Sequence, residues 1–113
     1  MRVLNLDTGG ELVRQLTVAA TVFSRAVGLL GRTSLPRGEG LLISPCKGVH
    51  TFFMKFPIDV VFLDGDNRII ATLVDLRPQR LTKLRLACRS ILELPAGTVR
   101  ESNTAVGNQL TIV

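Results

Sequence analysis

Short segments of strand length, either apolar or alternating between apolar and polar residues, recur along the whole chain. They span residues 2–7, 11–19, 41–43, 58–63, 68–76, 90–94 and 109–113, with turn-forming residues between them. The run 58–63 is apolar on both faces apart from Asp59, which is typical of a central strand. Paired glycines after Thr8 and the segment 64–67 each predict a hairpin turn.

The hydrophobic period changes to helical spacing over residues 21–31, which predicts the main helix. The apolar positions that recur on one helical face are Val22, Ala26, Leu29 and Leu30. Thr21 suits the N-cap of this helix. Gly28 costs a helix about 1 kcal/mol relative to Ala, so we expect another backbone to approach it closely. A short second helix is predicted over residues 95–101, because Pro95 suits a first helical turn.

Strands therefore outnumber helices, and most links between them are hairpin-like. The chain is predicted to form a single domain, 1–113, of the α+β class and predominantly β. We expect an antiparallel, barrel-like or sandwich-like sheet with the main helix against one end or face. No apolar run approaches the ~20 residues of a membrane helix. The N-terminus lacks the pattern of a signal peptide, so we expect a cytoplasmic location.

The segment between Asp75 and Glu93 is distinguished by its positive charge. The chain has 14 Lys and Arg against 9 Asp and Glu, and no acidic residue lies between Asp75 and Glu93. The predicted docking strip in this interval consists of Arg77, Arg80, Lys83, Arg85 and Arg89. Residues 83–86 alternate as a half-exposed edge strand does, and the strip fits an acidic partner, nucleic acid or anionic headgroups. Single-stranded nucleic acid is disfavoured because no aromatic side chains lie among these cations, and nonspecific binding to a duplex stays open.

Two carboxylates interrupt apolar runs and are the first candidates for a site. Asp59 and Glu93 each cost several kcal/mol to desolvate unless they are paired or hydrogen-bonded. In one cleft they would form an acid/base pair, and either would serve as a general base or ligand anchor. As structural groups, Asp59 would cap a turn or pair with an arginine, and Glu93 would face solvent or cap a helix. For Asp59 we favour the structural role.

Other side chains suit a binding pocket. His50 is the single histidine and a candidate acid or base. Arg25 and Arg32 offer fork-shaped donors for a carboxylate or phosphate, or else tie the helix to carboxylates or free carbonyls. Met54 suits the apolar lining of a pocket.

Neither a metal nor a cofactor is expected. Cys46 and His50 together fall short of the three or four ligands that zinc needs, and no phosphate-binding glycine loop is present. Cys46 and Cys88 are predicted to be reduced thiols, as is usual in the cytoplasm.

Three segments also carry a family resemblance. They run over residues 25–32, over residues 49–64 with a short His-Thr-Phe-Phe-Met sequence at 50–54, and over residues 92–97. In this order they resemble the domain-of-unknown-function family 192, across roughly residues 10–113. The resemblance implies a small β-rich fold with a helix and no established reaction. Relatives with the short form are similar to proteins found near pilus or secretion machinery, which implies an envelope, pilus or secretion setting.

These observations predict a non-catalytic ligand-binding or accessory module with a small-molecule or protein partner. Its pocket would be rimmed by Arg25, Arg32, His50, Met54, Asp59 and Glu93. One alternative is a small hydrolase-like enzyme that uses Asp59 or Glu93 with His50. A second is a basic nucleic-acid-binding protein. The binding module is favoured because no catalytic constellation is complete in the sequence.

Overall fold

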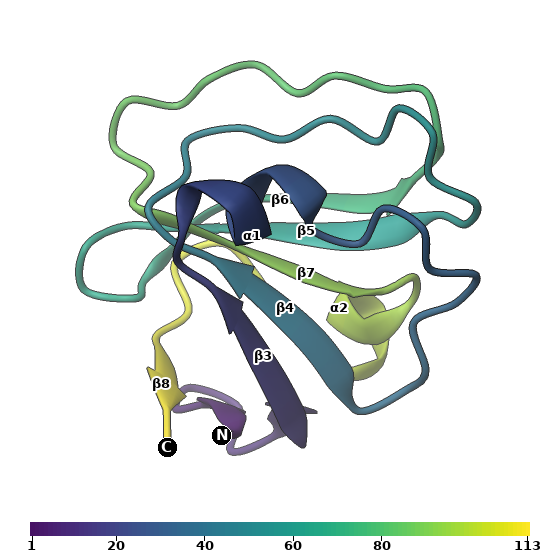
Figure 1. Ribbon diagram of the computed structural model, residues 1–113. Helices are drawn as coiled ribbons and strands as arrows, with labels where there is room; N and C mark the ends of the chain where they lie inside the picture. The colour runs from purple at the N-terminus through teal and green to yellow at the C-terminus, as the bar shows by residue number, and fades with distance from the viewer.

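The computed structural model describes all of residues 1–113, which form two sheets and two short helices (Figure 1). The helices are α1 (Val22–Val27) and α2 (Thr98–Glu101). The strands are β1 (Val3–Asn5), β2 (Glu11–Val13), β3 (Gln15–Ala19), β4 (Glu39–Ile43), β5 (Ile58–Leu63), β6 (Ile69–Leu76), β7 (Ser90–Pro95) and β8 (Leu110–Ile112). The α+β, predominantly β class is confirmed. Neither helix has the length and apolar character needed to cross a lipid bilayer.

A five-stranded sheet in the order β3-β4-β7-β5-β6 forms the central layer, and a three-stranded sheet in the order β2-β1-β8 packs against one of its faces. Neither sheet closes on itself, so the barrel-like alternative is wrong and the sandwich-like one describes this side of the molecule. The expectation of an antiparallel sheet is also wrong at one place. β3 and β4 pair in parallel, because α1 and a following loop carry the chain back across the sheet.

Both faces of the central sheet are covered. β5 and β7 are buried along their whole length, as predicted for a central strand. Successive strand residues point to opposite faces, so the two strands contribute to two separate cores. One core, between the sheets and under α2, includes Val61, Leu92 and Leu94. The other, under α1 and the long loops, includes Phe62 and Ile91.

The main helix is shorter than predicted. Thr21 is its N-cap, as expected, and shares a capping box with Ser24. The helix ends at Val27, and Gly28 follows with φ 49° and ψ −123°. This left-handed conformation favours glycine, whereas a Cβ there would find only ordinary contacts at 3.9 Å or more. Gly28 is therefore required for its conformation, and the expected close approach of another backbone is wrong.

Two other predicted elements also differ. The segment 11–19 is not one strand, because the chain passes from the small sheet to the large one at Arg14. The second helix begins at Thr98, since Pro95 still pairs with Ile58 as the last residue of β7.

Two long loops, residues 44–57 and 77–89, run side by side over the α1 face (Figure 1). Backbone bonds join them: Thr51 N donates to Arg80 O at 2.8 Å, and Thr82 N donates to Val49 O at 2.9 Å. Residues 83–86, predicted as an edge strand, belong to the second loop. One backbone bond, from Arg85 N to Lys47 O at 3.0 Å, joins them to the facing loop, and no ladder forms.

Candidate binding site

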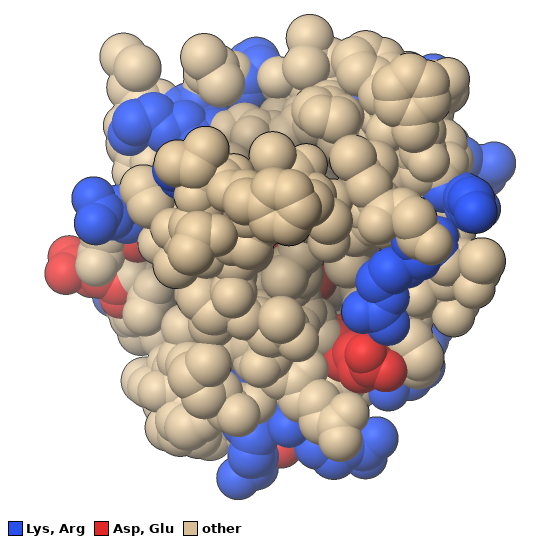
Figure 2. All heavy atoms as spheres, viewed as in Figure 1, with Lys and Arg blue, Asp and Glu red and all other residues tan.

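A cavity of about 420 Å³ lies between α1, the loop that follows β4, and the underlying sheet. Figure 2 views the molecule from the α1 side, where the centre of the surface is mostly tan and the basic side chains lie around it. The apolar lining includes Ala26, Leu29, Leu30, Ile43, Val49 and Met54. The polar lining includes Arg25, Cys46, His50 and Glu93.

Glu93 occupies the floor of this cavity. It lies on β7 and is only 3% exposed, with its side chain on the same face as Val60 of β5. Its carboxyl forms no hydrogen bond or ion pair with another group of the protein. Burial raises the pKa of the Glu93 carboxyl to about 7. The protonated carboxyl both donates and accepts hydrogen bonds, and this one has its full capacity free for a ligand.

Arg25 connects the helix wall of the cavity to the loop wall. Its Nη1 donates to the Pro45 carbonyl at 2.8 Å, and its Nε donates to the Thr21 carbonyl at 3.4 Å. The two carbonyls belong to the N-cap of α1 and to the loop after β4, and neither segment is part of the sheet. The predicted role of Arg25 in tying the helix to free carbonyls is thus present, and its guanidinium also lines the cavity.

Cys46 lies beside Glu93 and Arg25. Its Sγ donates to the Gly48 carbonyl at 3.1 Å. Burial is the largest cause that raises the pKa of the Cys46 thiol; the hydrogen bond to Gly48 opposes it, and the negative charge of Glu93 adds to it. The thiol is therefore protonated at neutral pH, which disfavours it as a nucleophile. Cys46 and Cys88 are both free.

His50 and Met54 come from the same loop but differ in depth. The His50 ring is exposed at the cavity rim and stacks on Phe52, with 5.4 Å between the ring centroids. Met54 is buried and contributes its thioether to the apolar wall. The loop thus presents one titratable ring outside and one apolar chain inside.

Four of the six residues predicted to rim a pocket meet in this cavity: Arg25, His50, Met54 and Glu93. Arg32 does not, because it pairs with Glu39 at 3.3 Å near the surface. Asp59 lies on the other face of the sheet. The expectation that Glu93 faces solvent or caps a helix is wrong, since its neighbours on the register place it in the α1-side layer.

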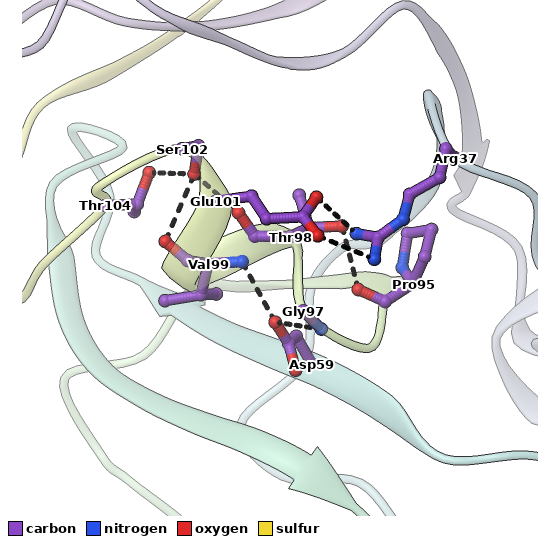
Figure 3. Close-up of polar contacts among 9 residues, drawn as sticks. All are labelled: Arg37, Asp59, Pro95, Gly97, Thr98, Val99, Glu101, Ser102 and Thr104. Carbon is purple, nitrogen blue, oxygen red and sulfur yellow. Dashed lines mark hydrogen bonds and ion pairs between the residues drawn. The ribbon is translucent and has the colours of Figure 1, made fainter.

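Asp59 has its oxygens occupied by backbone groups. Oδ1 accepts from Asp75 N at 2.9 Å. Oδ2 accepts from Gly97 N at 3.1 Å and Val99 N at 2.9 Å, as Figure 3 shows. These bonds fix the start of α2 and the irregular part of β6. The favoured structural role, capping a turn of backbone N–H groups, describes the contacts that Asp59 makes, and no arginine pairs with it.

Two further hollows, of about 260 and 410 Å³, flank α2. Most of their lining residues are polar, and their acidic groups are largely paired or hydrogen-bonded, whereas Arg14 and Arg100 are exposed without a partner. Arg37 pairs with Glu101 at 2.9 Å (Figure 3), and Asp59 is bonded as described. The cavity under α1 is the one with a free buried polar group.

The predicted docking strip is divided by the structure. Arg80, Lys83 and Arg89 are exposed, and Arg77 pairs with Asp75 at 3.2 Å. Arg85 instead turns inward, with its guanidinium carbon 4.1 Å from the centroid of the Phe62 ring. Its Nη1 is buried without a hydrogen-bond partner. Arg85 thus belongs to the packing under the loop, and only the others are available to a partner.

Sequence reasoning did not select Cys46 or Gly28 as site residues, although both line the cavity. Gly28 carries a usable signal, because a glycine inside an apparent helix often marks its end. Cys46 carries none beyond its place in a loop between two apolar segments.

The mixed five-stranded sheet, covered on both faces, and the cavity beneath α1 define a small α+β protein with one largely apolar pocket. The chain belongs to the DUF192 family, described as "Uncharacterized ACR", whose profile matches residues 4–112. A UPF0127 protein of Pyrococcus furiosus is 29% identical over 113 residues, covering 96% of this chain and 95% of that relative. The family resemblance is thereby confirmed.

Two solved structures share the fold at 21% identity each. A protein of unknown function from Novosphingobium aromaticivorans has a TM-score of 0.88 and covers 99% of this chain and 84% of its own. A candidate transcription regulator from Sinorhizobium meliloti has a TM-score of 0.83 and covers 97% of this chain and 89% of its own.

Proposed function

We propose that this protein is a non-catalytic binding module that holds a small amphipathic ligand in the cavity under α1. One observation carries the proposal: Glu93 is 3% exposed, has no partner in the protein, and faces a largely apolar cavity. The carboxyl oxygens are accessible from the cavity and are not used by the protein, so they are free to bond a ligand head group in a poorly solvated place.

The lining defines the ligand class. The cavity volume of about 420 Å³ falls within the range of small-molecule pockets, roughly 300–1,000 Å³. Leu29, Ile43 and Met54 favour an apolar body. Glu93 at the floor requires a hydrogen-bonding head group, and Arg25 contributes a guanidinium elsewhere in the same lining. The ligand is therefore an apolar molecule with one polar end.

The test uses three probes that share a chain and differ in head group: hexanol, hexanamide and hexanoate. We expect the amide and alcohol to perturb the NMR signals of residues around Glu93 and to raise the unfolding temperature. Glu93→Leu should weaken their binding at least about tenfold, the worth of one buried hydrogen bond. Glu101→Gln, at an exposed carboxyl, is the matched control and should bind normally. Equal binding by wild type and Glu93→Leu would overturn the proposal.

An acid/base enzyme is the second candidate, favoured by the pKa of Glu93 near 7 in a cavity that also contains His50. Asp59, the other predicted carboxylate, has no access to this cavity. Ester hydrolysis by wild type that disappears in Glu93→Gln, with probe binding retained, would establish the enzyme over the binding module.

The remaining expectations have narrower support. Nucleic-acid binding is supported only by the net charge of +5, because the likeness to the Sinorhizobium structure at 21% identity extends to the fold. The pilus or secretion setting rests on the resemblance of the short His-Thr-Phe-Phe-Met form. A cytoplasmic location stays a prediction from the sequence.

A further inference from the structure

A second surface lies on the long loop 77–89, which borders the cavity-lining loop 44–57 but contributes no residue to the cavity itself. Three leucines project from it: Leu81 and Leu84 are each 73% exposed, and Leu86 is 86% exposed. Exposed cations alternate with them. We call this surface the basic leucine crest and define it as Arg80, Leu81, Lys83, Leu84, Leu86 and Arg89.

The crest carries charge of one sign. No acidic residue occurs between Asp75 and Glu93, and Glu93 is buried under α1. The loops form the upper edge of the view in Figure 1, and the same edge in Figure 2 shows tan and blue atoms without red ones. Apolar and cationic side chains therefore share one anion-free surface.

Hydrogen bonds hold the backbone of loop 77–89 in a conformation that leaves its leucines exposed. Lys47 Nζ donates to the carbonyls of Leu86 at 2.8 Å and Cys88 at 3.0 Å. Arg85 N donates to Lys47 O at 3.0 Å, and the Arg85 side chain lies over Phe62. Three large apolar side chains held in water by a fastened backbone are typical of an interaction surface.

We propose that the basic leucine crest docks on the surface of an anionic lipid bilayer. None of its residues lines any of the three cavities, so the leucines project from the surface and form no groove for a peptide. A second copy of the chain would bring like charges together. A bilayer instead admits projecting leucines between its headgroups, and its anionic lipids attract the flanking cations.

The first experiment measures sedimentation with vesicles of phosphatidylcholine, with or without about 30% phosphatidylglycerol. We expect at least tenfold tighter binding to the anionic vesicles. Arg80→Gln/Lys83→Gln should weaken that binding about 25-fold, at about fivefold for each cation near the surface. Arg14→Gln/Arg100→Gln changes the net charge equally at exposed positions near α2 and should retain most of the binding. Equal binding to both vesicles, or an equal loss in both variants, would overturn the proposal.

The second experiment tests whether the leucines enter the bilayer. The chain contains no Trp or Tyr, so Leu86→Trp provides a single fluorophore on the crest. We expect its emission to shift to the blue on anionic vesicles. Leu81→Ser/Leu84→Ser should lose the binding that persists at high salt, where charge attraction is screened. Binding without a blue shift, or tight binding to poly-glutamate or RNA in place of vesicles, would contradict bilayer docking and indicate a soluble polyanion.

Discussion

The carboxyls of Asp59 and Glu93 point to opposite faces of one sheet, although β5 and β7 are neighbouring strands. The register pairs Asp59 with Leu94 and Glu93 with Val60, so the two acids are one position out of step. Asp59 accepts three backbone N–H bonds, whereas Glu93 accepts none from the protein. One acid therefore supports the fold and the other is free for a ligand, and the two do not meet in the one cleft that an acid/base pair would need.

Asp59→Ala is expected to destabilise the protein by about 3 kcal/mol, because it leaves three backbone N–H groups without an acceptor. Asp59→Asn keeps one acceptor oxygen and should lose less. The measurement is the free energy of unfolding in urea for both variants. A loss below about 1 kcal/mol in Asp59→Ala would contradict the structural role of the Asp59 contacts.

Glu93 is expected to make the protein less stable as pH rises. Its pKa is 4.5 as the ordinary value and about 7 in the folded state. The folded state therefore holds a proton that the unfolded state releases, so this stabilisation is complete below pH 4.5 and is lost as pH rises through 7. The difference between these two pKa values corresponds to a fall of about 3 kcal/mol in the free energy of unfolding over this pH range.

Urea unfolding of wild type and Glu93→Gln across this pH range isolates the effect. The free energy of unfolding of wild type minus that of Glu93→Gln should fall with rising pH, because every other ionisable group is common to both proteins. Parallel pH profiles would show that the Glu93 carboxyl ionises freely in the folded protein.

Gly28→Ala is expected to cost about 1–2 kcal/mol, because a side chain is strained at φ 49°. The end of α1 should loosen, and the amide of residue 28, which donates to Ser24 O, should exchange with solvent faster. Gly65→Ala is the control, since a Cβ there meets nothing within 4 Å and its φ is not positive. Similar stability losses in the two variants would rule out a special conformational requirement at Gly28.

Arg85→Met is expected to stabilise the protein by about 1 kcal/mol. The change removes a buried Nη1 that has no partner and keeps an unbranched side chain against Phe62. We expect the cation–π attraction to Phe62 that is lost to be smaller than the desolvation cost of Nη1 that is removed. Lys83→Met, at an exposed position, should change the free energy of unfolding by less than about 0.5 kcal/mol. Clear destabilisation by Arg85→Met would show that the stacked cation contributes more than assumed.

Local signals in the sequence identified the features that depend on neighbouring residues. The apolar run of β5 predicted a central strand, because a strand buried on both faces needs apolar residues on both. Thr21 predicted the start of α1, because an N-cap bonds within its own turn. The chemistry of single residues named six side chains for a pocket rim, and it could not separate Arg25, His50, Met54 and Glu93, which line the cavity, from Arg32 and Asp59, which do not.

Features that depend on distant pairing were not predictable in this way. The parallel pairing of β3 with β4 depends on the path through α1, which no local pattern encodes. Residues 83–86 alternate like a strand, yet they bond to an irregular loop. The face to which Asp59 points depends on the register of β5 against β7, and that register is set by the whole sheet.

The position of Glu93 has a consequence for how β7 assembles. If β7 paired with its neighbouring strands one residue out of register, each of its side chains would point to the opposite face of the sheet. The Glu93 carboxyl would then enter the closed apolar core that now surrounds Leu92 and Leu94. The desolvation would cost several kcal/mol, so mispaired forms are disfavoured from the outset. Glu93, which provides the polar group of the cavity, therefore also favours the correct register of β7.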